Sequence, residues 1–97
     1  MIKVLYSKRM PTIEIKGHAL FASAGNDIVC SAVSILTQYV AEIIENEGLG
    51  TYEKKKGYLK ITVRNETEVS KVLIDYLIKS LISISNDYPR NLKVEVR

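Results

Sequence analysis

The chain has 97 residues, of which 46% are hydrophobic and 26% charged, and its formal net charge is +3. This length allows one modest hydrophobic core, so we expect a single domain over residues 1–97. The apolar runs are too short to span a bilayer, and the N-terminus lacks the apolar block and cleavage site of a signal peptide. The mild positive charge permits contact with an anionic partner, but direct nucleic-acid binding is not expected. The single cysteine excludes an internal disulfide and suits a reducing cytoplasm.

Period-two alternation of apolar and polar residues predicts strands near both ends of the chain and in its middle. The alternating segments are 2–6, 12–16, 58–64 and 92–96. Met10 and Pro11 separate the first two segments as a hairpin turn would. Lys56 and Gly57 separate 51–55 from 58–64 and fit a two-residue turn with glycine in a left-handed conformation. One face of each strand is apolar, which indicates a largely antiparallel sheet covered on one side.

Two helices are expected between the strands. The first spans about 28–47 and ends at Gly48, and the second begins at residue 66 or 67, capped by Asn65 or Thr67, and ends near residue 86 before Pro89. The predicted order is ββαββαβ, an α+β fold with about five strands and both helices on one face of the sheet.

The second helix has more apolar residues than one buried face needs. A first stripe comprises Val69, Val72, Leu73, Tyr76, Leu77 and Leu81, and a second comprises Ile74, Ile78 and Ile82. We take the first as the core face. The second stripe either packs on the neighbouring helix or forms part of a homodimer interface, and the pattern does not choose between these.

The helical pattern places the only cysteine away from the expected core face of the first helix. That face comprises Ile28, Val29, Ala32, Val33, Leu36, Tyr39, Val40, Ile43 and Ile44. Cys30 lies roughly 130° from its centre at about 100° per residue. It shares the polar side with Asp27, Ser34 and Thr37, whereas a purely structural cysteine would be expected on the apolar side.

The position of Cys30 along the helix favours a nucleophile over an inert exposed thiol. If Asp27 is the cap, Cys30 is the third helical residue, where unpaired N–H groups and the positive helix end stabilise a thiolate. His18, the only histidine, precedes it by twelve residues at the end of a strand. A histidine at such a position is otherwise often a surface residue, but here it could take up the thiol proton and return it to a leaving amine.

Several neighbouring residues have open roles. Asp27 either only caps the helix or also orients the histidine. Phe21 either anchors the small-residue loop 19–26 or lines a substrate pocket, and Ser34 either binds substrate or is simply a small polar helix residue. Gly17 and Ala19 flank the histidine and leave it accessible.

The sequence contains no motif typical of a metal site or a phosphate-binding loop. One histidine and one cysteine cannot fill a zinc site without carboxylates, and Gly17 and Gly25 are too far apart for a phosphate loop, so neither a metal nor a cofactor is expected. The run of lysines at 54–56 beside Tyr52 and Tyr58 is typical of a solvated hairpin tip, although it could contact nucleic acid.

Around the histidine and the cysteine the chain resembles the ribosomal-processing cysteine proteases, the Prp family. In that family a Gly-His motif is followed by Gly-x-Asp-Ile-Val-Cys-Ala-Ala-Val-Ser. This sequence matches with Gly17, His18, Gly25, Asp27, Ile28, Val29, Cys30, Ala32, Val33 and Ser34, and departs from it only at Ser31.

The resemblance implies a cytoplasmic endopeptidase with Cys30 and His18 as its catalytic pair, Asp27 in support, and Gly17, Ala19, Phe21, Gly25 and Ser34 near the substrate. Its substrate would be the precursor of large-subunit ribosomal protein twenty-seven, cut after an aromatic and before a small residue during ribosome maturation. Family members are homodimers.

The residues themselves leave two other interpretations open. One is a non-enzymatic ribosome- or RNA-associated binding module; the other is a redox-sensing thiol, which would lack a resolving cysteine.

Overall fold

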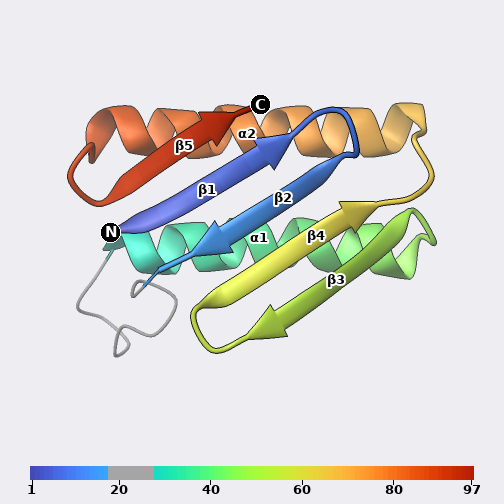
Figure 1. The fold of residues 1–97 in the computed structure, drawn as a ribbon, viewed down its shortest axis with the longest axis horizontal. Helices are drawn as coiled ribbons and strands as arrows, with labels where there is room; N and C mark the ends of the chain where they lie inside the picture. The colour runs from blue at the N-terminus through green and yellow to red at the C-terminus, as the bar shows by residue number, and fades with distance from the viewer. Residues whose placement is uncertain (18–27) are drawn as a thin grey trace.

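The computed structural model describes residues 1–17 and 28–97. Within these residues, seven elements follow one another in the predicted order (Figure 1): β1 (Ile2–Ser7), β2 (Thr12–Lys16), α1 (Ile28–Asn46), β3 (Gly50–Lys55), β4 (Tyr58–Val63), α2 (Glu68–Asp87) and β5 (Leu92–Val96). The strands form one sheet in the order β3-β4-β2-β1-β5, in which β1 and β5 are parallel and every other pair is antiparallel.

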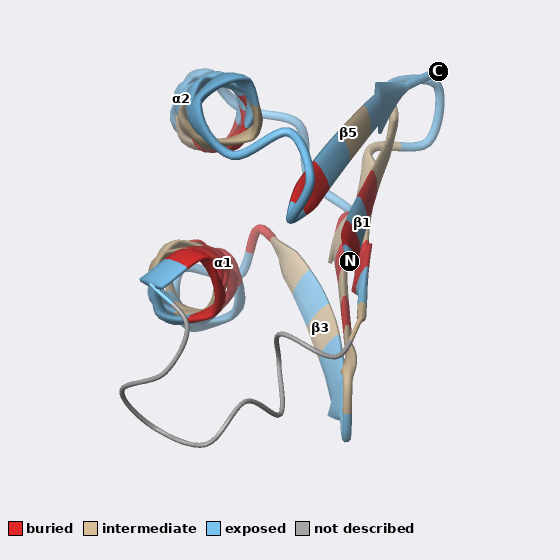
Figure 2. Ribbon diagram, turned by 90° about the vertical axis from the view of Figure 1, so that its left-hand side faces the viewer, coloured by how far each residue is buried: buried red, intermediate tan, exposed pale blue. Residues whose placement is uncertain are grey.

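Both helices cover the same face of this sheet, and the opposite face is open (Figure 2). The α+β prediction of two helices on one face of a five-stranded sheet is therefore confirmed. The core lies between the two layers, because the strands direct their apolar residues, apart from Leu5, toward the helices. The fully buried strand residues are Ile2, Val4, Ile13, Ile15, Ile61 and Leu92.

The predicted turns and caps also appear. Gly57 closes the β3–β4 hairpin, and Gly48 follows α1, each with φ of +70°, a conformation that glycine adopts without steric cost. Thr67 is the cap of α2: its hydroxyl accepts from the Ser70 N–H, and the Ser70 hydroxyl accepts from the Thr67 N–H. Asn65 has another role, since its side-chain amide donates to the Gly48 carbonyl at 2.9 Å.

The prediction for the core face of α2 was wrong in part, since Leu77 and Leu81 are buried as expected but other members of the stripe are not. Ile74 and Ile78, assigned to the surplus stripe, are buried, whereas Val69, Val72 and Tyr76 are exposed. Apolar residues surround more of this helix than one contact can cover, and hydropathy alone does not say which apolar sector meets the sheet. Two of the three residues of the surplus stripe are therefore in the core, and most of the exposed apolar residues of α2 come from the stripe that was assigned to the core.

Among the described residues, α1 is long and apolar enough to cross a membrane, with a mean hydropathy of 1.5. It packs on the sheet through Val33, Val40, Ala41 and Ile44, which are buried. Core helices of this length meet the same criterion, so the finding is weak evidence for a membrane span.

Candidate active site

Three segments lie toward the same end of the molecule: the end of β2, the first turn of α1 and the β3–β4 turn (Figure 1). Gly17 follows β2 there, and its N–H donates to the Gly57 carbonyl at 3.2 Å. Gly17 has φ of +144°, and a Cβ at this position would lie 2.6 Å from the Met1 carbonyl oxygen. Glycine is therefore needed for close backbone packing, immediately before the predicted catalytic histidine.

The helical pattern predicted the thiol of Cys30 on a polar face of α1, and this prediction was wrong. Cys30 is 6% exposed and belongs to the core together with Val29 and Val33. Ile28 and Tyr39, which were predicted to be in the core, are exposed instead. The helix contacts the sheet through a sector that includes small residues, and a small side chain such as cysteine lets a helix approach a sheet closely.

The same correction applies to the residue two turns after Cys30. Thr37, predicted on the polar face, is fully buried, and its hydroxyl donates to the Val33 carbonyl at 2.7 Å. This i to i−4 bond within the helix satisfies the hydroxyl.

Cys30 keeps the predicted position along the helix axis. It is the third residue of α1, which begins at Ile28. The first N–H groups of an α-helix have no carbonyl partner within the helix and carry the positive end of its dipole. An anionic sulfur or a developing oxyanion beside this turn is therefore favoured.

A groove of about 390 Å³ runs along α1 beginning one turn after Cys30. Its α1 wall contains Ser34, Thr37 and Gln38, and the facing wall is the β3–β4 hairpin over residues 54–59. The Lys54 ammonium donates to the Gln38 side-chain oxygen at 2.8 Å and so links the two walls. Ser34, one turn from the thiol, is the predicted substrate-binding residue that this groove contains.

The hairpin wall was missed as part of the site. The run of lysines at 54–56 was interpreted as a solvated tip or a nucleic-acid contact and not as part of the peptidase site, yet these residues line the groove. No local sequence signal connects Lys54 with Gln38, because sixteen residues separate them and only the packing of the hairpin on α1 brings them together.

At the hairpin, the Tyr58 hydroxyl donates to a carboxylate oxygen of Glu14 at 2.8 Å. This bond, with some burial, raises the pKa of Tyr58 to about 12, and the same bond lowers the pKa of Glu14. The pair joins β4 to β2 on the open face of the sheet.

His18, Ala19, Phe21, Gly25 and Asp27 lie outside the described residues, so their predicted roles stay predictions. Among residues 1–17 and 28–97 there is no cluster of three or more histidine, cysteine or acidic side chains that could hold a metal ion.

Comparison with known proteins identifies the class. A family model described as "Cysteine protease Prp" matches residues 1–93. The ribosomal processing cysteine protease Prp of Mycoplasma genitalium is 32% identical over 95 residues, covering 97% of this chain and 94% of that protein.

Solved structures show the same fold. The essential ribosomal processing protease Prp from S. aureus, in complex with a covalently linked product peptide, superposes with a TM-score of 0.82 at 21% identity, covering all of both chains. The same S. aureus protease with a substrate peptide gives a TM-score of 0.80 at 18% identity, again over all of both chains.

A two-layer α+β domain with a thiol in the first turn of a core helix, together with these matches, defines a cysteine protease. More particularly, the chain belongs to the Prp family of ribosomal-processing cysteine proteases.

Proposed function

We propose that this protease removes the N-terminal extension of large-subunit ribosomal protein twenty-seven, cutting after an aromatic and before a small residue, with Cys30 as nucleophile and His18 as general base and acid. The observation that carries the proposal is the position of Cys30 in the first turn of α1, one turn from a groove of about 390 Å³. The relatives that process ribosomal proteins support the choice of substrate.

The chemistry follows from this position. His18 takes the thiol proton, and Sγ of Cys30 attacks the peptide carbonyl carbon to give a tetrahedral oxyanion. The N–H groups at the start of α1, which have no carbonyl partner within the helix, are suited to hydrogen-bond that oxygen. Collapse breaks the C–N bond, the leaving amine takes the proton from His18, and water then hydrolyses the thioester.

The substrate approaches along the groove in this proposal. Ser34 lies where it can hydrogen-bond the peptide backbone, and Gln38 and Lys54 shape the far end. Asp27 would orient His18 or cap the helix. Gly17, Ala19, Phe21 and Gly25 would complete the substrate side.

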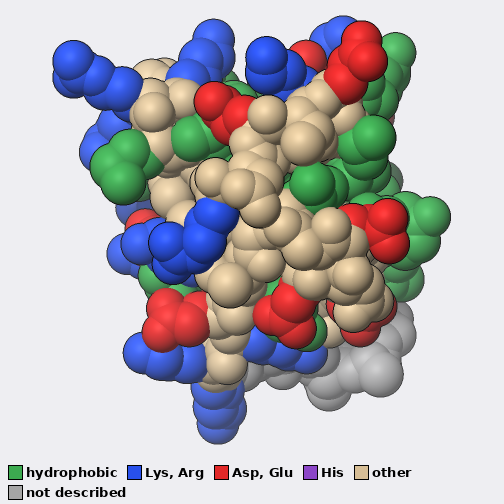
Figure 3. Space-filling model, turned by 90° about the vertical axis from the view of Figure 1, so that its right-hand side faces the viewer, with side chains coloured by type: hydrophobic (Ala, Val, Ile, Leu, Met, Phe, Trp, Pro, Cys, Tyr) green, Lys and Arg blue, Asp and Glu red, His purple; other side chains and the backbone are tan. Residues whose placement is uncertain are grey.

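We also propose that the enzyme acts in the cytoplasm as a homodimer that pairs through the helical layer. Exposed apolar residues lie one turn apart on each helix: Ile35 and Tyr39 on α1, and Val72 and Tyr76 on α2. Figure 3 shows hydrophobic side chains along the helical side of the molecule. Contiguous apolar surface of this kind is typical of an interface.

The test is mass spectrometry of a peptide copying the N-terminal extension of the host's own ribosomal protein twenty-seven. Wild type should cut it once. Cys30→Ala and His18→Ala should each lower the rate by roughly 10³-fold or more, since the nucleophile and its base act as a unit.

Ser31→Ala is the matched control, because Ser31 is exposed beside Cys30 and the related family motif has alanine there. It should cut normally. Near-normal turnover in Cys30→Ala or in His18→Ala would exclude the proposed pair, and an intact peptide with wild type would exclude the substrate.

A further inference from the structure

The charges of this protein are divided between its two layers. The strands with their turns and termini (residues 1–17, 50–64 and 88–97) contain twelve of the fourteen basic residues and three of the eleven acidic ones. The helical segments (residues 28–49 and 65–87) contain two basic and seven acidic residues. Figure 3 shows Lys and Arg gathered mainly on the sheet side. The small net charge therefore conceals a strongly basic sheet and an acidic helical layer.

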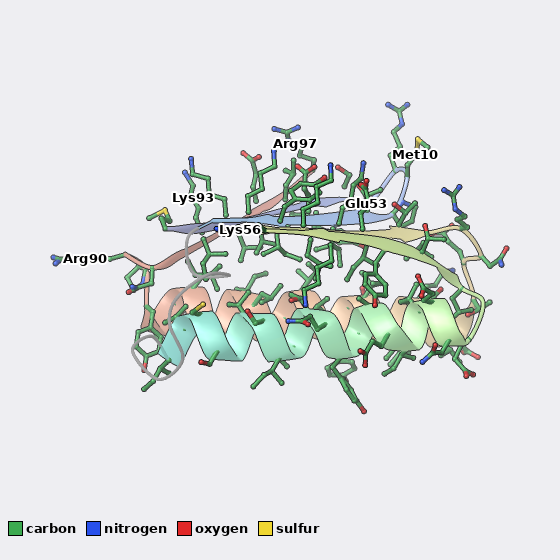
Figure 4. All side chains as sticks on the ribbon, turned by 90° about the horizontal axis from the view of Figure 1, so that it is seen from below. Met10, Glu53, Lys56, Arg90, Lys93 and Arg97 are labelled. Carbon is green, nitrogen blue, oxygen red and sulfur yellow. The ribbon has the colours of Figure 1, made fainter. Side chains whose placement is uncertain are left out.

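The open face of the sheet has a row of lysines across its strands. Strand register places Lys93 beside Lys3 and Lys3 beside Lys16. The row continues through Tyr58 to Lys55. At about 4.8 Å between strands, it is roughly 19 Å long. We call Lys3, Lys16, Lys55 and Lys93, all exposed, the lysine face. Lys93 points away from the helices, as does Arg97 nearby (Figure 4).

This arrangement costs stability. Like charges directly opposite one another in a sheet repel, and Lys3 has a lysine on both sides. Tyr58 offsets part of the repulsion at one end, since the ammonium groups of Lys16 and Lys55 each lie 5.9 Å from its ring centroid.

Two carboxylates, Glu14 and Glu95, lie in the next row of the same face, on either side of Leu5, and each pairs with a cation other than Lys3 and Lys93. Glu14 pairs with Lys16 at 3.4 Å and accepts from the Tyr58 hydroxyl, and Glu95 pairs with Arg97 at 3.2 Å. Within residues 1–17 and 28–97, Lys3 and Lys93 form no ion pair. Two adjacent cations are thus available to an anionic partner.

We propose that the lysine face binds RNA through its phosphate backbone, without reading the base sequence. Regularly spaced ammonium groups on a flat surface suit a polymer of phosphates. An anionic membrane fits less well, because Leu5 is the single large aliphatic residue pointing outward from the strands and it is partly buried. This inference goes beyond the proposed peptidase function and does not depend on it.

The experiment measures binding of a fluorescein-labelled RNA hairpin by anisotropy over a salt series. It compares Lys3→Gln/Lys93→Gln with the control Lys71→Gln/Lys79→Gln on α2, which removes the same charge from the acidic layer. The sheet variant should bind roughly tenfold more weakly at low salt. Its slope of log affinity against log salt should be shallower by about 1.4 to 1.8, since two phosphate contacts are removed. The α2 variant should bind like wild type.

Equal weakening in both double variants would overturn the proposal, because net charge and not the lysine face would then govern binding. The proposal would also be overturned if wild type showed no salt-dependent binding of RNA. It would be overturned as well if the sheet variant lost binding to phosphatidylserine vesicles but kept its binding to RNA. Circular dichroism checks the fold of each variant. RNA binding should survive Cys30→Ala, and peptide cleavage should survive Lys3→Gln/Lys93→Gln, so failure of either function is seen separately.

Discussion

The two layers of this protein turn opposite chemistry toward solvent. The helical layer exposes apolar residues among acidic ones, whereas the open face of the sheet exposes lysines and almost no aliphatic side chains. Only the inner surfaces of the two layers are constrained by the core. The contrast teaches that the outer surfaces can be specialised separately: the helical one suits the proposed dimer and the sheet suits the proposed RNA contact, with the thiol at one end between them.

The largest effect that sharpens this comparison is expected on the inner side of the sheet. Ile15→Ala should lower the free energy of unfolding by about 2 to 4 kcal/mol, because Ile15 is fully buried and truncation leaves a cavity. Lys16→Ala, the next residue on the open face, should change it by about 0.5 kcal/mol or less. Urea denaturation measures both. A similar loss in both variants would mean that the open face supports the fold and is not free for another role.

An intermediate effect is expected on the helical surface. Val72→Glu places a charge among exposed apolar residues and should raise the dimer dissociation constant about tenfold or more. Thr51→Glu, on the open face of edge strand β3, is the control and should leave it unchanged. Analytical ultracentrifugation compares the two, and stronger dissociation with Thr51→Glu would move the interface to the sheet.

The smallest effect concerns pH and the Tyr58–Glu14 bond. Because the pKa of Tyr58 is raised to about 12, its contribution to stability is present below pH 10.0 and is lost as the pH rises through 12. The pKa of Glu14 is lowered, so its contribution is present above pH 4.5 and is lost as the pH falls through the folded value.

Tyr58→Phe should therefore be less stable than wild type by about 0.5 kcal/mol between these limits, with a smaller difference at strongly acid or alkaline pH. Thermal unfolding across the pH range measures this. Tyr39→Phe on the helical layer should show no such window. A difference between Tyr58→Phe and wild type that does not depend on pH would contradict the assigned bond.

Local patterns were sufficient for much of the fold. Alternation located four of the five strands, Gly57 marked the turn that implied the fifth, Gly48 marked a helix end, and Thr67 was one of two proposed caps. These features depend on the conformational preferences of a few neighbouring residues, which a sequence displays directly.

Helix orientation could not be obtained in the same way. Both helices have apolar residues over more than one sector, and the sheet selects the sector that fits its surface. Cys30 and Thr37 are therefore buried, and Val72 and Tyr76 are exposed, contrary to the helical pattern.

The sequence by itself determined the family, the order of the elements and the thiol in the first turn of α1, because each is a matter of residue identity and short-range spacing. Only the tertiary structure decided the burial of that thiol, the groove shared by α1 and the β3–β4 hairpin, and the alignment of Lys93, Lys3 and Lys16. The physical reason is that these features join segments far apart in the chain, and strand register and helix packing alone bring them together.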